Sequence, residues 1–112
     1  MFKEFNVKEN LPTVEEAIGL IQIEIECCKK EGIKVLKVVH GYGSSGVGGN
    51  IFLSLKKHLV IWKKSGYILD YLFGDQWNSY NKKAMDIKYK FPSLPLDKDF
   101  NHSNMGMTII LL

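Results

Sequence analysis

The sequence predicts a small α/β (α+β) domain, a two-layer sandwich with the element order β-α-β-α-β-(α)-β, in which a small sheet is covered by two main helices. Short apolar runs rich in β-branched residues alternate with two longer stretches whose apolar residues recur at helical spacing. The chain has 112 residues, 46% of them apolar, which is sufficient for one domain with its own core. We therefore expect a single domain over residues 1–112, with an enlarged irregular segment at 75–104.

The first half of the chain has the pattern of a strand, a helix and a second strand. Residues 2–7 alternate weakly between apolar and polar, as in a half-buried strand. Thr13 and Glu16 match a capping box and Gly32 suits the position after a last helical turn, so a helix is expected between them. Its apolar positions, at steps of three and four, are Val14, Ala17, Ile18, Ile21, Ile25 and Cys28. The β-branched run 33–39 predicts the second strand.

The second half adds a helix, a strand, a short helix and a last strand. Residues 50–64 form an amphipathic helix, and 67–73 read as a strand closed by Gly-Asp. The apolar face of that helix consists of Phe52, Leu55, Leu59 and Trp62. A short helix is expected near 79–89, and the proline-bearing stretch 91–104 is expected to be irregular. The apolar run 107–112 predicts the last strand.

Charge and composition limit the functional classes. The net charge of +3 permits contact with nucleic acid, but all basic residues are lysines, which excludes base reading by arginine. The N-terminus has no apolar signal core and no stretch is long enough to cross a membrane, so we expect a cytoplasmic protein without membrane contact. Cys27 and Cys28 are adjacent on a helix and cannot easily pair, which predicts reduced core thiols.

The glycine-rich segment 41–49, between the second strand and the second helix, is the strongest functional signal. Its five glycines allow a ligand to approach backbone N–H groups, and a helix N-terminus behind them attracts anions. Phosphate is therefore the expected ligand. Gly41-Tyr42-Gly43-Ser44-Ser45-Gly46 also matches the G-x-G-x-x-G pattern of dinucleotide folds, with Asp70 downstream, but 112 residues hold hardly more than half of such a fold. A Walker-type phosphate loop is set aside because no Gly-Lys-Ser/Thr follows.

An apolar strand followed by His40-Gly41-Tyr42-Gly43, more glycines and an amphipathic helix with lysines resembles the Smr (small MutS-related) domain family. Phe5-Asn6-Val7-Lys8 with Leu11-Pro12-Thr13-Val14-Glu15-Glu16-Ala17 is similar to its opening motif L-D-L-H-G-x-T-V-E-E-A. Gly106-Met107-Thr108-Ile109-Ile110-Leu111 is similar to its closing strand. The resemblance implies a β-α-β-α-β-β fold like the C-terminal domain of bacterial translation initiation factor three. It also implies a DNA- or RNA-binding module that in many members nicks DNA or cleaves RNA.

The opening motif departs from the family at its acidic residue and histidine. These positions fall on Asn6 and Lys8, with Asn10 as an alternative to Lys8. An amide neither acts as a general base nor holds a metal ion as a carboxylate does. If the domain cleaves, His40 is the candidate for proton transfer, because an imidazole can transfer a proton near neutral pH, and Lys8 is the candidate for phosphate stabilisation. His40→Ala should then abolish cleavage while leaving the fold intact. A divalent metal such as magnesium would enter only in that case, and no other cofactor is expected.

The residues expected to contact nucleic acid lie in the glycine-rich segment and on the helix after it. They are His40, Gly41, Tyr42, Gly43, Ser44, Ser45, Gly46, Gly48, Gly49, Lys56 and Lys57, with Lys8 at one edge and Lys63 and Lys64 extending the positive surface. His58 is expected to be structural, and the Asp97-x-Asp99-x-x-His102 pattern to be plain surface without a metal. Most other aromatic residues should be core. The alternatives are a small nucleotide- or dinucleotide-binding domain and a protein-interaction adaptor that uses 75–104.

Overall fold

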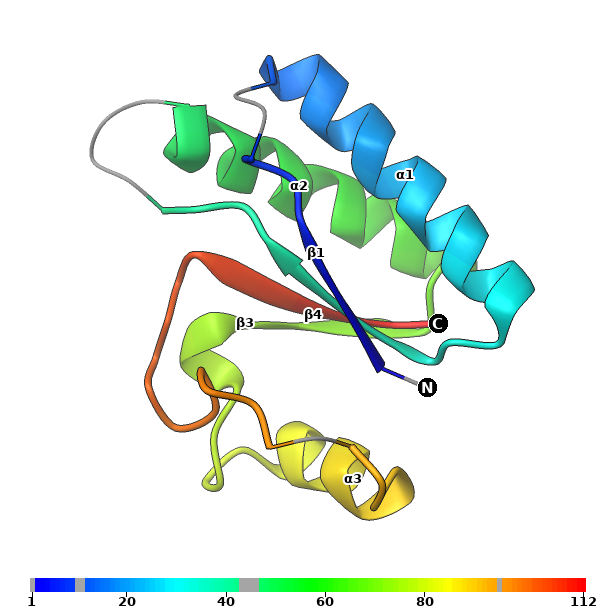
Figure 1. The fold of residues 1–112 in the computed structure, drawn as a ribbon, viewed down its shortest axis with the longest axis vertical. Helices are drawn as coiled ribbons and strands as arrows, with labels where there is room; N and C mark the ends of the chain where they lie inside the picture. The colour runs from blue at the N-terminus through cyan, green and yellow to red at the C-terminus, as the bar shows by residue number, and fades with distance from the viewer. Residues whose placement is uncertain (1, 10–11, 43–46, 95) are drawn as a thin grey trace.

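The computed structural model describes residues 2–9, 12–42, 47–94 and 96–112 (Figure 1). Its elements are β1 (Phe2–Asn6), α1 (Val14–Glu31), β2 (Val35–Val39), α2 (Val47–Lys64), β3 (Asp70–Phe73), the short 3₁₀ turn η1 (Gly74–Gln76), α3 (Lys82–Lys90) and β4 (Met107–Leu111). The predicted order of strands and helices is confirmed.

The four strands form one mixed sheet in the order β1-β2-β4-β3. β1 and β2 are parallel, with Asn6 opposite Val39, and β4 is antiparallel to both of its neighbours. β3 therefore runs in the same direction as β2. The ends of β1, β2 and β3 and the start of β4 consequently meet at one end of the sheet, which we call the carboxyl end.

Helices α1 and α2 cover one face of the sheet, as the sequence predicts (Figure 1). Every position named above for the apolar faces of the two helices is buried except Val14, which is half-buried. Their side chains pack on Leu36, Val38 and Ile110 of the central strands. Each fully buried leucine or isoleucine contributes about 1.5–3 kcal/mol relative to an exposed one, so this layer supplies much of the fold's stability.

The other face of the sheet is covered by the segment between β3 and β4, which was expected to be largely irregular. This segment, with α3, lies on the side of the sheet opposite to α1 and α2 (Figure 1). Trp77 from this segment and Ala84 and Ile87 from α3 pack on the sheet, and all three are buried. Their partners on the strands are Val35, Leu72, Met107 and Ile109. The central strands are thus buried on both faces.

The ends of the elements follow local capping chemistry. The predicted capping box is present, because the Thr13 hydroxyl accepts from the Glu16 N–H and Glu16 accepts from the Thr13 N–H. Gly32 ends α1 with a φ of 75°. The main correction concerns α2, which begins at Val47 rather than residue 50. Gly48 and Gly49 therefore belong to its first turn, where N–H groups need no partner within the helix.

Three further expectations need adjustment. α3 begins at Lys82, because Asn81 accepts from the Ala84 N–H as N-cap, and β3 begins only at Asp70. Both cysteines are free, as predicted, but only Cys28 is buried and Cys27 is exposed. Burial raises the pKa of the Cys28 thiol to about 11.

Among the described residues, no helix combines the length and apolar character needed to cross a membrane.

Candidate nucleic-acid interface

The carboxyl end of the sheet brings together two of the predicted site residues, Lys8 and His40. Parallel pairing of β1 with β2 continues one step beyond the strands, where the Val7 N–H donates to the Val39 carbonyl at 3.0 Å. The turn after β1 is closed by the Lys8 N–H, which donates to Asn6 Oδ1 at 3.1 Å. Asn6, which the sequence resemblance aligns with the family's acidic residue, therefore takes part in a turn.

His40 is fully buried at the end of β2 and both of its ring nitrogens are engaged. Nδ1 lies 2.7 Å from the Gly41 carbonyl oxygen, which can only accept, so Nδ1 carries the proton. Nε2 then accepts from the Thr108 hydroxyl at 2.9 Å. The ring also stacks on Phe52 of α2, with centroids 5.0 Å apart and planes 12° apart. This packing fixes the imidazole inside the domain, at the end of β2.

Burial lowers the pKa of His40 below its ordinary value of 6.5, against the raising effect of the Gly41 carbonyl, and the Lys8 charge lowers it further. Because the unfolded chain then binds a proton more readily than the folded one, the contribution of His40 to stability is present above about pH 6.5 and is lost as the pH falls through the lowered pKa.

We expect the free energy of unfolding of His40→Gln, measured with urea across pH, to fall less on acidification than that of the wild type. His102→Gln, at an exposed position, controls for removal of an imidazole, and equal pH profiles for wild type and His40→Gln would contradict the assignment.

The backbone after His40 is held by the start of β4. The N–H groups of His40 and Gly41 both donate to the Gly106 carbonyl, at 2.9 and 3.0 Å. Gly41 has a φ of 77°, a conformation that suits glycine. The backbone of His40 and Gly41 is therefore fixed relative to the start of β4.

Tyr42 differs from His40 because the residue is 57% exposed, while its ring makes a T-shaped contact with that of Phe52, with centroids 5.6 Å apart. Gly43, Ser44, Ser45 and Gly46 lie outside the described residues. Gly48 and Gly49 stand in the first turn of α2, where free N–H groups and the helix dipole favour an anion.

The lysines of α2 fall on two sides of the helix. Lys56 is exposed and places its ammonium 5.1 Å from the Phe52 ring centroid and 5.5 Å from that of Phe73. Lys63 lies on the same side but forms an ion pair with Asp70 at 3.0 Å. Lys57 and Lys64 are exposed on the outer side, away from the sheet. Lys8 and Lys56 are therefore the predicted lysines that the structure places beside His40 and its packing partners.

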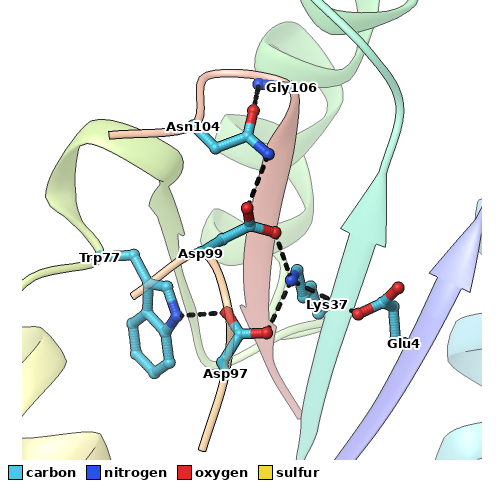
Figure 2. Close-up of polar contacts among 7 residues, drawn as sticks. All are labelled: Glu4, Lys37, Trp77, Asp97, Asp99, Asn104 and Gly106. Atoms are coloured by element: carbon cyan, nitrogen blue, oxygen red, sulfur yellow. Dashed lines mark hydrogen bonds and ion pairs between the residues drawn. The ribbon is translucent and has the colours of Figure 1, made fainter. Parts of the chain in front are cut away.

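A buried group of ion-paired side chains next to this site was not predicted from the sequence. It is centred on Lys37 of β2, which is fully buried (Figure 2). Its ammonium lies 2.7 Å from Asp97, 2.5 Å from Asp99 and 3.4 Å from Glu4. The Trp77 indole N–H donates to Asp97 at 2.9 Å. Burial alone would lower the pKa of Lys37, but its bonds to the two aspartates raise it above the ordinary value. The prediction that Asp97 and Asp99 are plain surface is therefore wrong, because they neutralise a buried charge.

Asn104 connects this charged group to the candidate site (Figure 2). Its amide Nδ2 donates to Asp99 at 3.0 Å and its Oδ1 accepts from the Gly106 N–H at 2.9 Å. Since the Gly106 carbonyl holds the N–H groups of His40 and Gly41, the ion-paired group on one face of the sheet supports the backbone at its carboxyl end. A lysine inside an otherwise apolar β-branched run was the sequence signal for such a group.

Within the described ranges, no group of three or more histidine, cysteine or acidic side chains is placed to hold a metal ion.

His58, expected to be structural, bonds to the Ser54 carbonyl at 2.9 Å and packs on Trp62. The sheet contains one parallel pair and an antiparallel β4, which differs from the parallel sheet of dinucleotide-binding folds. The geometry therefore disfavours the dinucleotide alternative.

Comparison with known proteins places this fold in one class, the Smr-like domains. The chain is similar to the Smr domain of Thermus thermophilus MutS2, known from a crystal structure. The TM-score is 0.61 over 98% of this chain and 96% of that chain, at 16% sequence identity. No protein-family model and no curated protein matches the sequence. The likeness lies in the fold and confirms the Smr-like architecture.

Proposed function

We propose that this Smr-like domain binds nucleic acid at the carboxyl end of its sheet. The observation that carries the proposal is that Lys8 follows β1 and the exposed Tyr42 follows β2 at this end, and that the Tyr42 ring contacts Phe52 in the first half of α2. Lysine ammonium groups and free helix N–H groups bind phosphate, and an exposed aromatic ring stacks on a base. Within the described ranges, neither Lys8 nor Lys56 has a carboxylate within ion-pair distance, so both charges are available to a ligand.

The geometry of His40 supports binding rather than cutting. Proton transfer to a ligand would require Nε2 to give up the Thr108 hydroxyl, and the buried ring would have to become accessible. We expect DNA and RNA incubated with the protein to remain uncut on gels. Products that disappear with His40→Ala would instead assign cleavage to this histidine.

Fluorescence anisotropy with labelled nucleic acid, titrated across salt concentration, tests the binding proposal. Each phosphate contact contributes about 0.7–0.9 to the slope of log affinity against log salt, so Lys8→Gln and Lys56→Gln should each reduce the slope by about that amount. Lys82→Gln is the matched control, because Lys82 is exposed on α3 and lies 3.7 Å from Asp86. Equal slopes for wild type and both site variants, or no binding at low salt, would overturn the proposal.

A further inference from the structure

A row of aromatic rings leads from the candidate interface along the outer edge of the sheet. Tyr42, Phe52, Phe73 and Tyr71 follow one another with successive centroid separations of 5.6, 5.4 and 5.5 Å. The first ring follows β2, the second lies on α2 and the last two lie on the edge strand β3. We call these four residues the aromatic row.

The aromatic row has an accessible side. Tyr42 is exposed, and Phe73 and Tyr71 are half-buried, whereas Phe52 is buried and joins the others. A row made only to fill the core would be covered along its whole length. This row is instead covered at its centre and open at its ends.

Positive charge accompanies the aromatic row. The Lys56 ammonium lies over the rings of Phe52 and Phe73, and the Lys63 ammonium lies 6.0 Å from the Tyr71 ring centroid. Asp70 Oδ1 is 3.0 Å from both Lys63 and Lys83, so two ammonium groups share one carboxylate and a net positive charge remains. Burial acts to raise the pKa of Asp70, but the Tyr71 N–H and the two lysines lower it, which keeps the carboxylate charged.

The edge of β3 is poorly suited to pairing with another strand. The Tyr71 N–H donates to Asp70 Oδ1 at 2.8 Å and the Phe73 N–H donates to Gln76 Oε1 at 3.0 Å. A peptide adding a strand here would need such N–H groups to be free. These two N–H groups of β3 are therefore already occupied, and a ligand at this edge would contact its side chains.

We propose that the aromatic row is a track for single-stranded nucleic acid, with bases against Tyr42, Phe73 and Tyr71 and phosphates near Lys56 and Lys63. Unpaired bases can stack on exposed rings, whereas bases in a duplex are already stacked on one another. The inference rests on the proposed function, because it names the substrate class for the same interface. Since stacking and phosphate contact are common to RNA and DNA, the track is expected to accept both.

The test compares labelled oligo-U, oligo-dT and a duplex, each of about twelve units, by anisotropy at one salt concentration. Loss of one stacking ring should weaken single-strand binding about 5- to 100-fold, so Tyr42→Leu and Tyr71→Leu should show this loss while duplex binding is unchanged. Tyr42→Phe and Tyr71→Phe, which keep the ring, should restore binding. Tyr80→Leu is the matched control, because Tyr80 is 97% exposed and lies outside the row.

The outcomes separate this inference from the proposed function. Equal affinity for single strands and duplex, with no loss in Tyr71→Leu, would overturn the track while nucleic-acid binding stands. Absence of binding to all three ligands would overturn both. Thermal unfolding of each variant shows whether it folds. If Tyr71→Leu does not fold, unchanged single-strand affinity in Tyr42→Leu, at an exposed position, overturns the track instead.

Discussion

Lys37→Met is expected to destabilise the folded state by about 3–5 kcal/mol, because removing one partner of a buried ion pair leaves the others unpaired. Methionine fills most of the space of the lysine stem but cannot neutralise Asp97 and Asp99, whose side chains are only 6% and 13% exposed. Urea unfolding near neutral pH measures the loss. Lys98→Met, in the same segment but exposed, is expected to change stability by less than about 0.5 kcal/mol.

The pH dependence of this loss identifies its cause. Burial acts to raise the pKa of Asp99, but the bonds from Lys37 and Asn104 lower it below its ordinary value, so its stabilising contribution is present above about pH 4 and is lost as the pH falls through the lowered pKa. Without Lys37 the same carboxyl group takes up a proton at higher pH. The deficit of Lys37→Met should therefore shrink on acidification. A deficit that is independent of pH would show that lost packing, not unpaired charge, explains the effect.

The parts of the fold that depend on local chemistry were predictable from sequence. The Thr13 capping box, the Gly32 terminus and the apolar faces of α1 and α2 depend on residues within a few positions of one another. The order of the strands along the chain and the position of Lys8 near His40 were also expected. They follow from the strand–helix alternation and from the family resemblance.

The parts that were missed depend on contacts between distant residues. Lys37 meets Asp97 and Asp99 across about half of the chain, and no local pattern marks that pairing. The same segment places Trp77 and α3 on the second face of the sheet, which turns an expected irregular excursion into part of the core. In the candidate site, local sequence identified His40 but not its burial, which results from Phe52 of α2 and Thr108 of β4.

Gly74→Ala is expected to be among the most disruptive single substitutions, because the turn after β3 touches the segment that supports the candidate interface. A Cβ at this position would lie 1.5 Å from the Asn104 carbonyl oxygen and 2.4 Å from its carbon. Both atoms belong to the backbone, so a side-chain rotation cannot relieve the overlap. We expect a loss of about 3 kcal/mol or more in the free energy of unfolding.

The displacement of Asn104 in Gly74→Ala should also change the backbone of the candidate interface. Asn104 holds Gly106, whose carbonyl accepts from the N–H groups of His40 and Gly41, so the amide NMR signals of these two residues should shift and affinity for nucleic acid should fall. Gly19→Ala is the matched control, since a Cβ there meets nothing within 4 Å and alanine inside a helix is favoured by about 1 kcal/mol. That variant should be more stable and bind normally. A Gly74→Ala protein with wild-type stability and unshifted signals would show that Asn104 does not position the backbone of the interface.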